Sequence, residues 1–192
     1  MKQFVEAPDF LQKVIEQAHK NSVEARELAG ELTDKQLNWK LQPEQWSIAQ
    51  CLDHLAVTGE RFDKYYTEAI RLGREKWPVR ETIPYRPTFV GGWLLKQVTP
   101  EVKRKLPAPK VFRPSESITI TGSLEKFIRQ QDVFLGFVRA ASGLDYNRIR
   151  LRSPVTPLMR YSLADAFVVT VLHGQRHLGQ ARRMRETAGF PE

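Results

Sequence analysis

The chain of 192 residues contains one cysteine, Cys51, and no long uninterrupted apolar run. A single cysteine excludes an intramolecular disulfide and a cysteine-rich zinc site. The longest apolar stretch, residues 163–172, is interrupted by Asp165 and is too short to span a bilayer. The first residues include no apolar segment typical of a secretory signal peptide. We therefore expect a cytoplasmic protein with no membrane-spanning helix and no membrane partner.

Acidic residues are fewer than basic ones, 22 against 30, which gives a formal net charge of +8. Such an excess can indicate an anionic partner. The basic residues are scattered, however, and form only short clusters at 103–105 and at 182–183 with Arg185 close by. No stretch interleaves aromatic and basic residues in the way of a single-strand binder. We therefore expect a solvated basic surface, and nucleic acid is a minor alternative.

Apolar residues make up 41% of the chain and charged residues 27%, which is ordinary for a globular protein. The length suits a single domain over residues 1–192, and no internal repeat is evident. A chain of this size can bury a sufficient core without disulfides or a structural metal. A bound metal would therefore serve function more than folding.

Hydrophobic periodicity and capping residues predict four long helices. The second begins at a capping box formed by Ser47 and Gln50, and the fourth begins similarly at Ser162. We expect a loop over residues 37–44 and a short extended piece over 150–154, because prolines interrupt both regions. The expected helices span about 10–28, 48–72, 124–142 and 163–188.

A long proline-rich connection, residues 77–118, separates the second and third predicted helices and holds seven of the 12 prolines. Loops of this length in compact domains are uncommon and usually functional. Because this connection carries Tyr85, Phe89, Trp93 and Leu94, we expect it to pack on the body, with a short helix around 93–97. Four long helices and no convincing sheet predict an all-α four-helix bundle with a crossover.

Two of the four histidines, His173 and His177, lie four residues apart in the last predicted helix. This spacing puts both side chains on one helix face, about 5–6 Å apart, where they can share one metal ion. Their neighbours along that face are apolar or small, so we expect the pair to face the interior. Two inward imidazoles are costly when charged and hard to satisfy when neutral. A shared cation would resolve both problems.

The remaining candidate residues are weaker. His54 lies at the edge of the apolar stripe of the second helix and could reach the same site, although a lone histidine there is more often structural. We expect His19 to lie on the surface and Cys51 to be a small core residue. Asp53 points away from His54 on a helix, so we expect it to be solvated or in a surface ion pair.

Three motifs together resemble the DinB/YfiT-like superfamily. They are Trp-Ser-Ile at 46–48, Asp-His-Leu at 53–55 and His-x-x-x-His-Leu-Gly-Gln at 173–180. The resemblance extends from the first helix to Arg185. It implies a four-helix bundle with a long crossover between helices two and three. It also implies a divalent metal, commonly nickel or zinc, held by three histidines. By motif position these are His54, His173 and His177.

Relatives in this superfamily include S-transferases that use bacillithiol, mycothiol or glutathione, a maleylpyruvate isomerase, and proteins described as metal-dependent hydrolases. The resemblance therefore implies a divalent-metal-dependent enzyme acting on small molecules, either a low-molecular-weight-thiol S-transferase or a hydrolase. The alternative is a non-catalytic, stress-related bundle protein that binds metal. We also expect a homodimer.

The chain departs from its relatives just before the last helix. Relatives often carry a His-Pro segment followed by glycine, where this chain has Ser153-Pro154 and no glycine before Ser162. We therefore expect a different substrate pocket with the same three metal ligands. The sequence identifies no catalytic base and no residues that bind a thiol cofactor.

Overall fold

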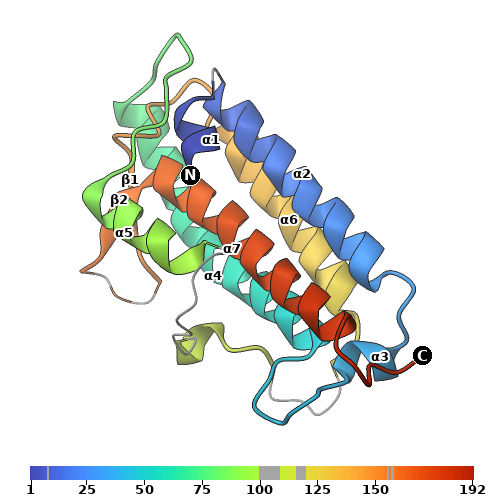
Figure 1. Ribbon diagram of the computed structural model, residues 1–192. Coiled ribbons are helices and arrows are strands. Elements are labelled where there is room, and N and C mark those ends of the chain that lie inside the picture. Colours follow the sequence, from blue (N-terminus) through green and yellow to red (C-terminus); the bar gives the residue numbers. More distant parts are fainter. Residues whose placement is uncertain (8, 100–108, 116–119, 155, 157) are drawn as a thin grey trace.

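The computed structural model describes residues 1–7, 9–99, 109–115, 120–154, 156 and 158–192. Its body consists of four long helices that run side by side (Figure 1). Helix α4 packs against α6 and α7, and α2 packs against the same two helices. The predicted all-α four-helix bundle is confirmed. The bounds of these helices are α2 Phe10–Ala29, α4 Ile48–Lys76, α6 Ser123–Ala140 and α7 Leu163–Arg185.

Side chains fix where three of the four helices begin. The Asp9 carboxylate accepts a hydrogen bond from the backbone N–H of Gln12 at 3.0 Å and caps α2. Capping boxes at Ser47 and Ser162 begin α4 and α7, as the sequence predicts. Helix α6 begins instead at Gly122, whose φ of 62° is left-handed, without a side-chain cap. These boundaries set the rotation of the faces that meet inside the bundle.

Short elements complete the fold: α1 Lys2–Val5, α3 Asp34–Asn38, α5 Phe89–Val98, the 3-10 turn η1 Lys110–Phe112, β1 Arg150–Arg152 and β2 Arg160–Ser162. Strands β1 and β2 pair antiparallel, with Leu151 opposite Tyr161. The extended piece expected at 150–154 is thus one strand of a hairpin that the sequence did not predict. Three-residue strands are too short to produce a recognisable alternation.

Within the long connection, helix α5 packs on α7 at the outside of the bundle (Figure 1). Tyr85 is buried as expected, whereas Phe89 is 94% exposed and Trp93 is 50% exposed. The described part of the connection therefore packs on the body as expected, although the side chains of Phe89 and Trp93 are themselves exposed. The basic cluster at 103–105 lies outside the described residues. Across the part of the chain that is described, no helix has the length and hydrophobicity to cross a membrane.

The basic cluster near the C-terminus, at 182–183 and 185, contacts helix α2. Arg182 forms an ion pair with Glu24 at 2.6 Å, and Arg185 donates to the carbonyl oxygen of Leu28 at 2.7 Å. These contacts hold the last turns of α7 against α2. The positive charge of this cluster therefore contributes to packing.

The apolar core divides into two clusters along the bundle axis. One cluster includes Phe10, Tyr66 and Phe167, and the other includes Ile48 and Leu178. On α7 the two histidines lie between the clusters, whereas the histidine of α4 lies among residues of the second cluster. The fold therefore places polar imidazoles in an otherwise apolar interior.

Candidate metal centre

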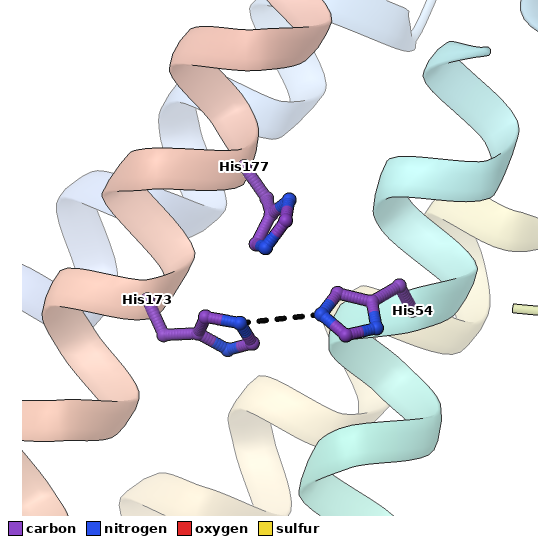
Figure 2. Close-up of side chains that lie close together, drawn as sticks. All are labelled: His54, His173 and His177. Atoms are coloured by element: carbon purple, nitrogen blue, oxygen red, sulfur yellow. Dashed lines mark hydrogen bonds between the residues drawn. The ribbon is translucent and has the colours of Figure 1, made fainter. Parts of the chain in front are cut away.

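Helices α4 and α7 bring three imidazole rings together (Figure 2). His54 projects from α4, and His173 and His177 project from α7 into the space between the two helices. Ligand atoms chosen one from each ring all lie within 4.8 Å of one another. The Nε2 atoms of His54 and His173 are 3.2 Å apart. The three residues named from the sequence thus occupy one site.

Close contact with α2 holds the histidine-bearing part of α7. The Nδ2 atom of Asn21 donates to the carbonyl oxygen of Val171 at 3.0 Å. Gly174 leaves room for this side chain, because a Cβ at that position would lie 2.5 Å from the Asn21 Nδ2 atom. The glycine next to His173 therefore allows α2 to approach closely and fix the position of α7 at the site.

The orientation of His54 is set by the backbone of the crossover segment. Its Nδ1 atom donates to the carbonyl oxygen of Phe112 at 2.5 Å. Because Nδ1 carries the proton, the lone pair of Nε2 is directed at the two α7 histidines. A hydrogen bond to the second ring nitrogen is a typical way to fix the tautomer of a metal-ligating histidine. Sequence reasoning missed Phe112, since a distant backbone carbonyl leaves no signal in the residue pattern.

Trp46 covers one side of the three histidines. Its ring centroid lies 4.7 Å from that of His54. It lies 5.5 Å from that of His177, and the rings of Trp46 and His177 are stacked with an interplanar angle of 28°. The residue directly precedes Ser47, the N-cap of α4, so the capping box also places this ring. In the sequence Trp46 was recognised as part of a motif and as the residue before the helix cap. Its contact with the histidines depends on the packing of α7 and could not be read from either signal.

All three histidines are neutral at pH 7. Burial lowers the pKa of His54 below its usual value, against the opposing effects of the Phe112 carbonyl and Asp53. Burial and the neighbouring imidazoles hold the pKa of His173 well below its usual value. Burial and the nearby His54 lower the pKa of His177 to about 3. Neutral imidazole is the form that binds metals.

A divalent cation fits this donor set. Three uncharged imidazoles suit zinc or nickel, and three protein ligands leave at least one coordination position open. The Nε2 atoms of His54 and His173 share a hydrogen bond at 3.2 Å, drawn as a dashed line in Figure 2. The Nδ1 atom of His177 is also buried and has no hydrogen-bond partner among the described residues. The single hydrogen bond between His54 and His173 therefore leaves His177 unengaged at this atom, and a shared cation would engage all three rings.

Asp53, next to His54 in sequence, is only 4% exposed. The prediction of a solvated or surface position was therefore wrong, although an ion pair is present. One carboxylate oxygen accepts from Lys126 Nζ at 3.1 Å, and the other accepts from the backbone N–H of Ser115 at 2.7 Å. The partners lie on α6 and in the crossover, so no local pattern could indicate them. Asp53 thus joins three segments beside the site.

The other two minor candidates lie where the sequence predicts. His19 is exposed on α2. Cys51 is buried, and burial raises the pKa of its thiol to about 12. A thiol with this pKa stays protonated near neutral pH, which makes it a weak ligand and nucleophile.

A small cavity of about 40 Å³ lies beside His173, between α4, α6 and α7. Polar side chains in its lining include Thr58, Asp63, Gln130 and Thr170. Gln130 donates to the Asp63 carboxylate at 2.8 Å, and burial raises the pKa of that carboxyl. The Thr58 hydroxyl is buried with no hydrogen-bond partner among the residues described. A cavity of this size and polarity suits a few water molecules.

Comparisons with known proteins agree with this architecture. The model of one protein family, the DinB superfamily, matches residues 17–181. Among solved structures, the chain is similar to YfiT from Bacillus subtilis, described as a probable metal-dependent hydrolase with an unusual four-helix bundle topology. The TM-score is 0.60 at 17% identity, over 96% of this chain and 91% of the YfiT chain. No curated protein matches the chain. At this identity, the likeness to YfiT concerns the fold.

Proposed function

The chain belongs to the DinB superfamily, and we propose that it is a divalent-metal-dependent enzyme acting on small molecules, with hydrolysis as its reaction. The observation that carries this proposal is the convergence of three neutral imidazoles from α4 and α7. Such a set leaves a coordination position open, which is typical of catalytic sites.

His54, His173 and His177 would hold the metal, as zinc or nickel. The Phe112 carbonyl keeps the Nε2 lone pair of His54 directed into the site, and the ring of Trp46 excludes solvent from one side. When bound, a divalent metal lowers the pKa of a water or thiol that it ligates and so supplies a nucleophile at neutral pH.

Hydrolysis is favoured by the cavity beside His173. A volume of about 40 Å³ admits water and excludes most larger nucleophiles. The carboxylate of Asp63 and the unpartnered hydroxyl of Thr58 supply hydrogen-bonding groups for water in this cavity. YfiT, with the same fold, is described as a probable metal-dependent hydrolase.

The second candidate is a low-molecular-weight-thiol S-transferase, which would use the same three histidines. Its support is the resemblance of the motifs at 46–48, 53–55 and 173–180 to the superfamily, whose members include thiol-dependent transferases. The net charge of +8 suits an anionic thiol. In a non-catalytic, stress-related protein the histidines would still hold metal. Turnover therefore separates these alternatives, whereas metal content does not.

The first experiment measures metal content by mass spectrometry on untagged protein. We expect about one nickel or zinc per chain in the wild type and a loss of at least tenfold in His173→Ala. His19→Ala is the matched control, because His19 is exposed on α2, and it should retain the metal. No stoichiometric metal in the wild type, or full retention in His173→Ala, would contradict the proposal.

The second experiment offers the metal-loaded protein ester and amide substrates, and then pairs of a thiol with an electrophile. Metal-dependent hydrolysis supports the first candidate. Turnover that requires a thiol would show that the protein is an S-transferase and not a hydrolase. Bound metal with no turnover in either panel supports the non-catalytic alternative.

A further inference from the structure

One side of the molecule combines exposed apolar side chains with positive charge. This face, here called the α5–hairpin face, consists of residues 82–99, which include α5, and of the described residues between 146 and 164, which include β1 and β2. Helix α5 packs against β2, so the two segments are adjacent (Figure 1). Neither segment contains an aspartate or glutamate. Their charged residues, all cationic and all exposed, are Arg86, Lys96, Arg148, Arg150, Arg152 and Arg160.

The positive charge of this face is not neutralised by ion pairs among the described residues. Within the described part of the chain, none of the six cations forms a salt bridge, whereas Lys126, Arg71 and Arg182 elsewhere do. Arg152 and Arg160 stand opposite each other across the hairpin. Like charges directly opposite on a strand pair are mutually unfavourable. The hairpin therefore carries a local positive charge that an anionic partner would relieve.

The apolar groups of this face are unusually exposed. Phe89 and Trp93 are 94% and 50% exposed, and they lie four residues apart on one side of α5. Lys96, three residues beyond Trp93, is exposed as well. Leu158, just before β2, is 95% exposed. Large apolar side chains gathered on one surface usually mark an interaction site.

Helix α5 is firmly held beneath these side chains. Thr88 caps the helix by accepting from the Gly91 N–H at 3.0 Å, and its own hydroxyl donates to Asp165 at 2.7 Å. At the other end Arg176 donates to the carbonyl oxygens of Gln97 and Thr99, each at 3.3 Å. Phe89 and Trp93 are therefore presented to solvent by a helix anchored at both ends.

We propose that the α5–hairpin face binds peripherally to an anionic lipid bilayer. Tryptophan and phenylalanine partition to the headgroup region, and cations around them pair with lipid phosphates and carboxylates. Apolar insertion and electrostatic attraction together give stable binding where either alone is marginal. Two copies of this face would bring like charges together, which disfavours self-association through it.

Co-sedimentation with vesicles tests the proposal. We expect binding to vesicles of phosphatidylcholine with about 30% phosphatidylglycerol and little binding to phosphatidylcholine alone. Higher salt should weaken the binding, because it screens the charges. Removing two cations by Arg152→Gln with Arg160→Gln should lower the partition coefficient about 25-fold, at about fivefold for each charge. Phe89→Ser with Trp93→Ser should lower it at least tenfold.

The matched control carries Val23→Ser and Arg26→Gln, two exposed positions on α2 outside this face. It should bind vesicles like the wild type, and thermal melts should show that every variant is folded. Absence of wild-type binding to anionic vesicles, or an equal loss in the control, would overturn the proposal. If the wild type does not bind vesicles but forms dimers, and Phe89→Ser dissociates these dimers, the face is a self-association surface instead.

Discussion

At the scale of single residues, the site depends on groups that are not histidines. The Phe112 carbonyl selects the tautomer of His54, and the ring of Trp46 packs on two of the three imidazoles. Asp53 binds the backbone of Ser115, three residues beyond Phe112. This carboxylate therefore restrains the segment that orients His54.

The first residue-scale prediction concerns the pH dependence of stability in the metal-free protein. The folded-state pKa of His177 is about 3, below the unfolded value of about 6.5. As pH falls below 6.5, the unfolded chain binds a proton that the folded chain does not. The unfolding free energy should therefore fall by about 1.4 kcal/mol per pH unit for each such histidine. Urea unfolding at pH 7, 6 and 5 measures this slope.

In the variant His177→Gln, the unfolding free energy should depend less steeply on pH below 6.5. The slope should be smaller than that of the wild type by about 1.4 kcal/mol per pH unit. His19→Gln, at an exposed position, should keep the wild-type slope. If His177→Gln and the wild type have the same slope between pH 6 and 5, His177 is not a neutral buried group.

The second residue-scale prediction concerns Asp53. Asp53→Ala removes the acceptor for Lys126 and for the Ser115 N–H. Because Lys126 is about a third exposed, we expect a moderate loss of about 2 kcal/mol in unfolding free energy. Looser positioning of Phe112 should also weaken metal binding about tenfold. Chemical denaturation and metal titration measure the two effects.

Glu60→Ala is the control, because Glu60 contacts the same lysine at 3.9 Å but is half exposed. Exposed pairs contribute little, so its unfolding free energy should change by no more than about 0.5 kcal/mol. Equal effects of the two substitutions would show that Asp53 has no special role.

At the scale of elements, the buried carboxylate of Asp165 joins α7 to α5. It completes the capping box of α7 with Ser162 and accepts hydrogen bonds from the hydroxyl groups of Tyr85 and Thr88. Gly91 allows this arrangement, since a Cβ there would lie 2.0 Å from Asp165 Cγ. The close approach explains a glycine inside a helix, where it is otherwise unfavourable.

The adjacent glycines Gly91 and Gly92 provide an element-scale prediction. Gly91→Ala should lower the unfolding free energy by at least about 2 kcal/mol, because the new methyl group collides with a buried carboxylate. Gly92→Ala meets no atom within 4 Å and should be neutral or stabilise the helix by up to about 1 kcal/mol. Thermal or urea unfolding of both variants tests this contrast. Equal effects would contradict the described packing of α5.

The same glycines show why elements were only partly predictable. Three of the long helices begin at caps that can be read locally, so their starts were found within a residue. Helix α5 was expected only around 93–97, because two glycines argue against a helix, yet it begins at Phe89. Its helical state depends on contact with Asp165, which is distant in sequence. Non-local contacts of this kind leave no periodic signal.

At the scale of the whole molecule, the bundle and the three histidines were predictable for different reasons. Amphipathic spacing within each helix is a local property, and it was enough to predict the bundle. The i, i+4 spacing placed His173 and His177 on one face, whereas the helix pattern made His54 only a weaker candidate that the motif resemblance supported. The packing of α4 on α7 supplies the physical reason. The roles of Phe112 and Trp46 required the assembled fold.

The central claim is that one divalent metal is held by imidazoles from α4 and α7. Its most direct test is an anomalous-scattering map from crystals of untagged protein, collected on both sides of the nickel and zinc absorption edges. We predict one strong peak within about 2.0–2.2 Å of a ring nitrogen of each of His54, His173 and His177. No peak between the three rings in metal-supplemented crystals, or a metal bound only elsewhere on the chain, would contradict the account.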